Sequence, residues 1–414
     1  MSKFNGNIMQ VFIDDLDPLE CSPEQGPSTK AFSKMRCGSF GLASLLSALL
    51  LLSACAGLPV HGSVGMQTID SRVDSEVARY YLANYLAGKR DDAVLDERID
   101  RVYQNANGAL PNRDDLKKLS DDFSVDFAAL YLADQISRMP GNRRFRRAFD
   151  QAYDYARKTF PEGRVVLPAA AADYEVLFVP TYLYKRLTFT GADMAVPRAA
   201  LQKAGFKCYF VETKDDGAVE TNADLVSAAI RAHAQSGRRL IIVSASKSGP
   251  EVALALTKLG PAETRHVAAW INTVGALQGT PMADEHLAPE LDYMFGKLDP
   301  AGTESIKTEW SRRRFESFRI PEHVLVVNYF GIPVSGSISF LGRRGFFSMR
   351  KYGPNDGIVL LSDMIFPGGV TLAELGGDHF MLNDHRNITT VALAITVIQW
   401  VESREHQISA KPGK

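Results

Sequence analysis

From about residue 163 onward, short apolar runs alternate with stretches of helical periodicity. The runs are rich in β-branched residues and have few polar interruptions, which is typical of strands buried on both faces of a sheet. Strands that alternate with helices predict a mainly parallel sheet covered by helices on both sides. We expect strands near 176–179, 208–211, 240–243, 267–271, 324–328 and 370–373, and helices over 196–204, 221–236, 248–259 and 384–403.

Residues 70–160 have a different pattern, in which apolar residues recur every third or fourth position. One such series is Val73, Val77, Tyr81 and Tyr85. This spacing places apolar side chains on one face of a helix, so the region is predicted to be helical. The chain is therefore divided into a leader over 1–54, a helical region over 55–162 and an α/β domain over 163–408.

The segment before Cys55 has the pattern of an export signal. Lys34-Met35-Arg36 precedes an apolar run over 40–52, which is shorter than the ~20 residues of a membrane-spanning helix. The run ends in Leu52-Ser53-Ala54-Cys55, which resembles the lipobox of bacterial lipoproteins. The resemblance implies cleavage before Cys55 and acylation of its thiol, for example with palmitate. A plain signal peptide or an inserted anchor helix is the alternative.

Acyl chains on Cys55 would attach the mature protein to a membrane of the bacterial envelope, because each buried methylene contributes about 0.8 kcal/mol. By the same resemblance, Ala56 favours the outer membrane, since an aspartate there would favour the inner one. The polar stretch ahead of Lys34 is long for an export signal, so Met35 is an alternative start.

Composition narrows the possible partners. Hydrophobic residues make up 45% of the chain and charged residues 23%, and the net charge is -1, so nothing predicts a nucleic-acid partner. Cleavage would remove Cys21 and Cys37, and Cys208 would remain without a partner, so no disulfide is expected. The sequence has no metal-binding or phosphate-binding motif, so we expect neither a metal nor another cofactor.

The predicted strand over 240–243 runs into Ser244-Ala245-Ser246-Lys247-Ser248-Gly249-Pro250, and a predicted helix follows directly. A strand, a tight turn and a helix present the middle serine at the edge of the sheet. Ser244 and Ser248 stand where a Gly-x-Ser-x-Gly turn has glycines, so small side chains are kept although the motif is altered. Here the chain resembles the α/β-hydrolase superfamily, and the resemblance implies that Ser246 is a nucleophile.

The same resemblance implies an acid after the strand two beyond the nucleophile. Asp356, in the turn Asn355-Asp356-Gly357, follows the strand over 324–328 and is the expected acid. The turn is also explained by local backbone preference alone. Asp363 and Asp284 are weaker candidates.

The histidine of the family follows the last strand, and His379 in Gly376-Gly377-Asp378-His379-Phe380 occupies that place. His266 and His323 fall at the starts of strands, on the wrong edge of the sheet, and His385 belongs to the next helix. In the implied triad, His379 takes the proton of Ser246, and Asp356 orients the imidazole.

An oxyanion intermediate needs two backbone N–H donors. Lys247, which follows the nucleophile, is one expected donor. The other comes from the loop after the first core strand, where Tyr182 is preferred to Thr181.

Residues 281–320 are expected to form a cap or lid over the site, and residues 330–352 a second loop near it. The Arg312–Arg314 run is interpreted as a solvated helix face, with contacts to anionic lipid headgroups as the alternative. The sequence thus predicts a serine hydrolase that cleaves a small-molecule ester or a lipid, as an esterase or a lipase does. An amidase or thioesterase with the same triad is the alternative, as is a non-catalytic lipoprotein that uses the fold for binding.

Overall fold

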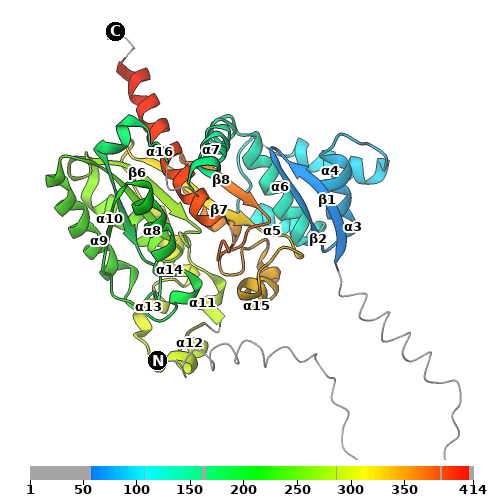
Figure 1. Ribbon diagram of the computed structural model, residues 1–414. Coiled ribbons are helices and arrows are strands. Elements are labelled where there is room, and N and C mark those ends of the chain that lie inside the picture. The colour runs from blue at the N-terminus through cyan, green and yellow to red at the C-terminus, as the bar shows by residue number, and fades with distance from the viewer. Residues whose placement is uncertain (1–56, 107, 161–164, 286, 383–384, 410–414) are drawn as a thin grey trace, which may run out of the picture.

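The computed structural model describes residues 57–409, apart from 107, 161–164, 286 and 383–384. Its centre is a six-stranded parallel sheet with the strand order β4-β3-β5-β6-β7-β8 (Figure 1). Every strand expected from residue 163 onward is present. The bounds are β3 (Tyr174–Val179), β4 (Lys207–Phe210), β5 (Arg239–Ala245), β6 (Val267–Thr273), β7 (Leu325–Ile332) and β8 (Val370–Leu375).

Helices cover both faces of the sheet. On one face, side chains of β3 and β5 pack against α7 (Pro140–Thr159), α8 (Ala195–Ala204) and α16 (Arg386–Ser409). On the other face they pack against α9 (Val219–His233) and α10 (Ser248–Glu263). The strand order and the helices on both faces are those of an α/β-hydrolase fold, as expected. The helices supply the cover that each apolar strand needs on both sides.

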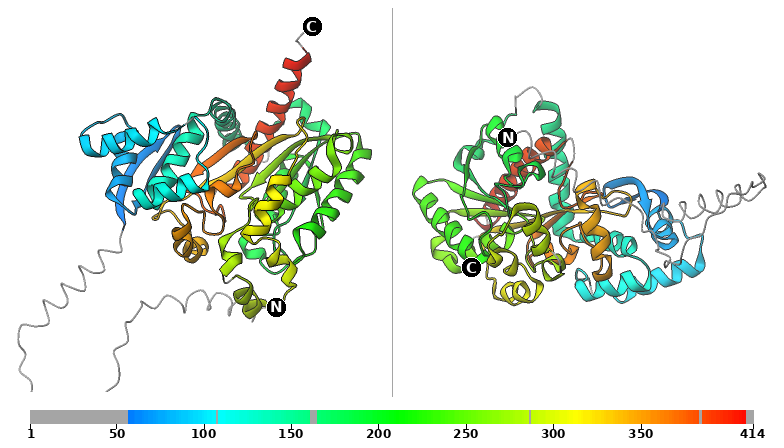
Figure 2. Two further views of the ribbon diagram at one scale, coloured as in Figure 1. Left: turned by 180° about the vertical axis from the view of Figure 1, so that it is seen from behind. Right: turned by 90° about the horizontal axis from the view of Figure 1, so that it is seen from below.

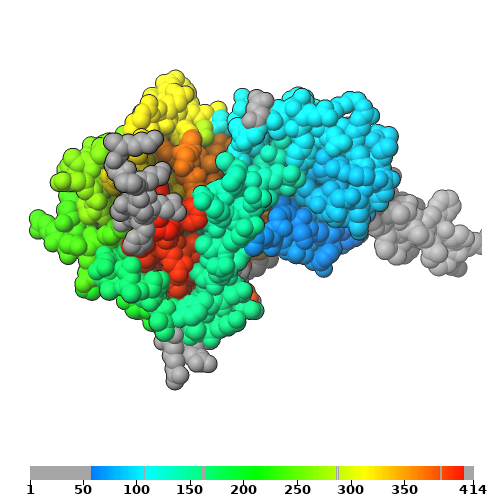
Figure 3. Space-filling view, turned by 90° about the horizontal axis from the view of Figure 1, so that it is seen from above, coloured from blue at the N-terminus to red at the C-terminus, as the bar shows by residue number. Residues whose placement is uncertain are grey.

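The helix α7 lies in the N-terminal region, yet it packs along α16 at the other end of the chain (Figure 3). The ring of Phe145 stands edge-on to that of Trp400, with 5.3 Å between the ring centroids. Both helices thus contribute to one hydrophobic core with the sheet.

The rest of the N-terminal region begins with an antiparallel hairpin of β1 (Leu58–Val64) and β2 (Gln67–Val73), where the sequence analysis expected helix. The buried residues fall four apart on each strand, as Ile69 and Val73 do. A spacing of four fits one face of a strand as well as one face of a helix, so it does not distinguish them. The following helices are α3 (Glu76–Tyr80), continued by a π-helical turn over Tyr81–Tyr85, α4 (Ala93–Gln104), α5 (Arg113–Asp122) and α6 (Val125–Arg138).

The hairpin covers the edge strand β8. The side-chain amide of Gln67 donates to the carbonyl of Ala373 and accepts the N–H of Leu375, both at 2.9 Å. An uncovered edge strand offers its backbone groups to other chains. The hairpin therefore closes that edge of the sheet.

The segments between β6 and β8 form helices beyond the carboxyl ends of the strands, at the lower side of Figure 1. They are α11 (Pro281–Glu285), α12 (Leu287–Phe295), α13 (Pro300–Glu304), α14 (Thr308–Ser317) and α15 (Phe340–Met349). The segment over 330–352 is therefore not a plain loop. Figure 2 shows these helices from behind and from below.

The Arg312–Arg314 run lies on α14 and is not a uniformly solvated face. The guanidinium of Arg314 donates to Glu220 and to the carbonyl of Ser305, both at 2.7 Å. Its side chain is only 9% exposed, so it fastens α14 to the body of the protein.

No helix within the described residues combines the length and the apolar character that are needed to cross a bilayer.

Candidate active site

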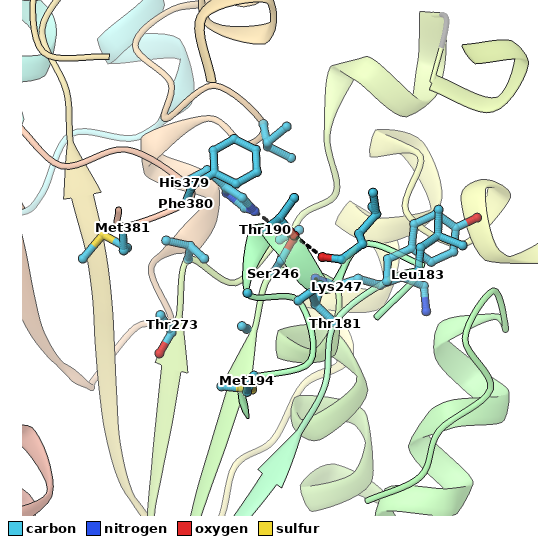
Figure 4. A pocket seen from close by; sticks show the side chains of 18 of the residues that line it. Thr181, Leu183, Thr190, Met194, Ser246, Lys247, Thr273, His379, Phe380 and Met381 are labelled. Atoms are coloured by element: carbon cyan, nitrogen blue, oxygen red, sulfur yellow. Dashed lines mark hydrogen bonds between the residues drawn. The ribbon is translucent and has the colours of Figure 1, made fainter. Parts of the chain in front are cut away.

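Ser246 lies in a strained turn between β5 and α10. Its φ is +53°, a left-handed conformation that side chains with a Cβ rarely adopt. The backbone N–H of Ser246 donates to the carbonyl of Thr273 at 3.0 Å, which fixes the turn against β6. The turn thus holds the Ser246 side chain above the end of the sheet (Figure 4).

The serines at the two glycine positions of the motif have structural roles. Ser244 is buried, and its hydroxyl accepts the indole N–H of Trp270 at 2.8 Å. The Ser248 hydroxyl lies 2.9 Å from the carbonyl of Val179 and accepts the N–H of Ala245 at 2.8 Å. Both side chains fit within the turn and form hydrogen bonds there, so the altered motif is compatible with a tight turn. A glycine at either position would lose these hydrogen bonds.

Three residues that are far apart in the sequence converge beside this turn. The Nε2 atom of His379 lies 3.0 Å from the Oγ atom of Ser246 (Figure 4). Its Nδ1 atom lies 2.7 Å from Oδ2 of Asp356. These distances are within hydrogen-bonding range. The sequence analysis named these three residues, and the structure brings them into one hydrogen-bonded chain.

The Asp356 carboxylate is completely buried and firmly held. Its Oδ1 atom accepts the backbone N–H groups of Ile358 and Val359, at 2.9 and 2.7 Å. The N–H of His379 donates to the Asp356 carbonyl at 2.9 Å, so the two loops are also joined through the backbone. Oδ2 is thereby directed at the imidazole.

Asp378 supports the histidine loop in a role that the sequence analysis did not assign. Its carboxylate is buried and accepts the N–H of Ser339 at 2.7 Å and the N–H of Phe380 at 3.0 Å. Ser339 is the N-cap of α15. The only sequence signal for this role is that Asp378 is next to His379.

The rival candidates lie elsewhere. Asp363 is buried in an ion pair with Arg113 at 2.7 Å, and Asp284 accepts the N–H of Thr308 at 3.0 Å. His266 and His323 bond backbone carbonyls near the starts of strands, as expected. His385 is exposed just before α16.

The two expected oxyanion donors lie on adjacent segments. The N–H of Lys247 donates to the hydroxyl of Thr181 at 3.2 Å (Figure 4). The N–H of Thr181 donates to the Ala192 carbonyl at 3.2 Å, whereas no hydrogen bond among the described residues uses the N–H of Tyr182. Of the two alternatives in this loop, Tyr182 thus has the available donor.

The Lys247 side chain points away from the Ser246 hydroxyl and pairs with an acidic residue instead. Its ammonium group pairs with Glu251 one turn along α10 at 2.5 Å, and both side chains are buried. Burial raises the pKa of Glu251, and the Lys247 charge opposes that rise. The ammonium also lies 5.6 Å from the centre of the Tyr182 ring, so the pair steadies both expected donor residues.

A cavity of about 480 Å³ opens beside Ser246 and His379. Most of its wall is apolar, with contributions from α8, α12, α16 and the loop before α8. Residues of the expected cap, among them Met282, Leu287, Leu291 and Met294, line one side. Within the described residues, no group of three or more histidine, cysteine, aspartate or glutamate side chains could hold a metal ion.

No protein-family model and no curated protein sequence matches this chain. Among solved structures, a metagenomic carboxyl esterase is similar over 58% of this chain and 78% of its own, with 19% identity and a TM-score of 0.48. The mature form of a Bacillus licheniformis lipase matches 52% of this chain and 88% of its own, with 21% identity and a TM-score of 0.43. A phospholipase from Legionella pneumophila matches 46% and 45% of the two chains, with 15% identity and a TM-score of 0.36. These similarities concern the fold alone.

Proposed function

We propose that the protein is a serine hydrolase that cleaves carboxylic esters, with Ser246, His379 and Asp356 as its catalytic triad. The observation that carries the proposal is the hydrogen-bonded chain from Ser246 Oγ through both ring nitrogens of His379 to Asp356. A serine hydroxyl is a weak nucleophile at neutral pH and needs such a base.

In the proposed reaction, Ser246 attacks the carbonyl carbon of the ester while His379 takes its proton. Asp356 holds the imidazole in the tautomer with the proton on Nδ1 and stabilises the imidazolium that forms. The N–H groups of Lys247 and Tyr182 bind the oxyanion. His379 then protonates the departing alcohol. In the second half of the reaction, water attacks the acyl group while His379 takes its proton, and His379 returns a proton to Ser246 as the carboxylic acid leaves.

The mainly apolar wall of the cavity suits the apolar part of an ester or lipid substrate, and an amide or thioester cleaved by the same triad is the alternative. A non-catalytic binding role is less well supported. The serines that replace glycine are accommodated in the turn, and Ser246 keeps the strained conformation that presents its hydroxyl to the base.

The test is labelling of the purified protein with a fluorophosphonate, which reacts with activated serines. Wild-type protein should be labelled, and Ser246→Ala should not. Ser403→Ala, which changes an exposed serine on α16, is the matched control and should be labelled like the wild type. Folded wild-type protein that stays unlabelled would contradict the proposal and favour the binding role.

We further propose that Cys55 carries a lipid that attaches the protein to the bacterial envelope, preferably to the outer membrane. Cys55 and the residues before it lie outside the described residues, and the proposal rests on the lipobox sequence. The fold begins at Leu58, three residues further on, which is at most about 10 Å of extended chain. A lipid at Cys55 would therefore hold the folded body close to the membrane surface.

Incorporation of labelled palmitate in bacterial cells tests the anchor. The label should be lost in Cys55→Ser and kept in Cys208→Ser, which changes the thiol of β4. A label that persists in Cys55→Ser would refute the anchor without affecting the hydrolase proposal.

A further inference from the structure

We propose that the esters cleaved at Ser246 carry a long acyl chain, and that this chain lies inside the protein, between the sheet and the helices α8 and α16. The proposal rests on the hydrolase function proposed above and names its substrate class.

The first observation is that the cavity extends below the reacting serine along the face of the sheet. Ala245, Val243 and Ile241 line it, and these alternate residues of β5 point to the same side. Ile241 lies five positions before Ser246, which is about 16 Å along an extended chain. The cavity therefore continues well beyond the space that a short acyl group fills.

The neighbouring strand forms the same wall at the same depth. Phe178 on β3 is in register with Val243, and Val176 is in register with Ile241. Both β3 residues line the cavity. Val176 and Ile241 are at most 1% exposed, so this part of the wall lies deep inside the protein.

Helices form the opposite wall. Leu201 of α8 and Leu393 and Ala394 of α16 line the cavity and are buried. The polar lining residues of α16 belong to its first two turns, near the histidine loop, where Arg386 donates to the Met381 carbonyl at 3.2 Å. The deep part is thus apolar on both walls. It suits methylene groups, because a polar group placed there would lose its hydration without replacement.

The order of the reaction assigns the two halves of the ester to the two ends of the cavity. The alcohol leaves first and needs a way out past His379, whereas the acyl group stays bonded to Ser246 until water releases it. The outer part of the cavity includes the exposed residues Phe189 and Tyr293, and Arg344 with its partner Glu290. This open, partly polar end suits the alcohol, and the buried apolar end suits the acyl chain.

The test compares p-nitrophenyl butyrate, octanoate and laurate as substrates of the purified protein. We expect kcat/KM to rise with chain length, with laurate exceeding butyrate by at least roughly tenfold. In Ala394→Leu, whose larger side chain fills the deep part, the ratio of the laurate to the butyrate value should fall by roughly tenfold or more. Gln399→Leu introduces a leucine on the exposed side of α16 and should leave this ratio unchanged.

A second variant guards against misfolding. If Ala394→Leu fails to show a cooperative thermal transition, Ala394→Val takes its place, and the same ratio should fall by a smaller factor. Methyl laurate should also be cleaved faster than lauryl acetate, because only the former places the long chain on the acyl side.

The outcomes separate the two proposals. Butyrate hydrolysis with no preference for longer chains, or a preference that the Ala394 variants leave intact, would overturn the acyl-chain proposal and leave the hydrolase function standing. Absence of both ester hydrolysis and fluorophosphonate labelling in folded wild-type protein would overturn the hydrolase function, and the acyl-chain proposal with it.

Discussion

The carboxylate of Asp378 accepts the backbone N–H of Ser339 at 2.7 Å, which ties the loop that carries His379 to the first turn of α15. Asp378 points away from the reacting atoms, so it is a positioning residue. This contact adds to the bonds from Asp356 that hold the imidazole beside Ser246.

Replacing Asp378 should impair catalysis more than substrate binding. In Asp378→Ala we expect kcat to fall by roughly tenfold to a hundredfold with little change in KM, because a small displacement of a catalytic group is costly. Asp378→Asn keeps an acceptor oxygen and should recover part of the loss. Steady-state kinetics on a short-chain ester measures both constants. A rise in KM at constant kcat would contradict the positioning role.

Asp356→Asn should lower kcat/KM by roughly a thousandfold to ten-thousandfold, because an amide fails to hold His379 in the reactive tautomer. The fold should persist, since an amide oxygen still accepts the N–H groups of Ile358 and Val359. Activity close to wild type in Asp356→Asn would remove this residue from the triad.

The matched control is Asp363→Asn, which changes a buried carboxylate outside the site. It breaks the ion pair with Arg113 and should lower the free energy of unfolding by about 3 kcal/mol. At temperatures where the variant is folded, kcat/KM should stay within about threefold of the wild type, because Asp363 does not contact the triad.

Gly345→Ala should disturb the acid loop. A Cβ at Gly345 would lie 1.8 Å from the carbonyl oxygen of Gly357, so α15 and the loop must separate. We expect a loss of about 1–3 kcal/mol in unfolding free energy together with reduced kcat. Gly141→Ala is the control, because a Cβ there meets nothing within 4 Å and should stabilise the start of α7 slightly. Unfolding in urea measures both, and equal effects would contradict the packing argument.

Asp126 should make stability depend on pH. Burial, with the nearby Asp74 carboxylate, raises the pKa of Asp126 to about 7 from an ordinary 3.8. Between these values the folded protein binds a proton that the unfolded chain has released, so the contribution of this group falls as the pH rises from about 4 to about 7. Relative to the wild type, Asp126→Asn should gain stability over this range. Urea unfolding at several pH values checks this, and a difference that does not vary with pH would contradict it.

The sheet could be predicted because its strands are buried on both faces and therefore form apolar runs. The three residues of the proposed triad could also be predicted, since Ser246 and His379 lie in short local patterns that follow particular strands. Asp356 required the strand order as well as its own turn.

Other features depend on contacts between distant segments and left little trace in the sequence. The hairpin was read as helix because buried residues four apart fit both structures. Asp378 became recognisable only when α15, which was expected to be a loop, brought Ser339 to it. The cavity arises from space left between β5, α8 and α16, and apolar residues that line it look like ordinary core residues.

The strand β5 both carries the Ser246 turn and forms one wall of the cavity. Its residues Val243 and Ile241 are held by the backbone hydrogen bonds of β5 to β3 and β6, so changes in this wall also disturb the position of Ser246. The opposite wall includes Leu201 and Ala394, which belong to helices that carry none of the three proposed catalytic residues. Under the proposed function, substitutions on these helices can therefore change which acyl chains are accepted without disturbing β5 or the position of Ser246.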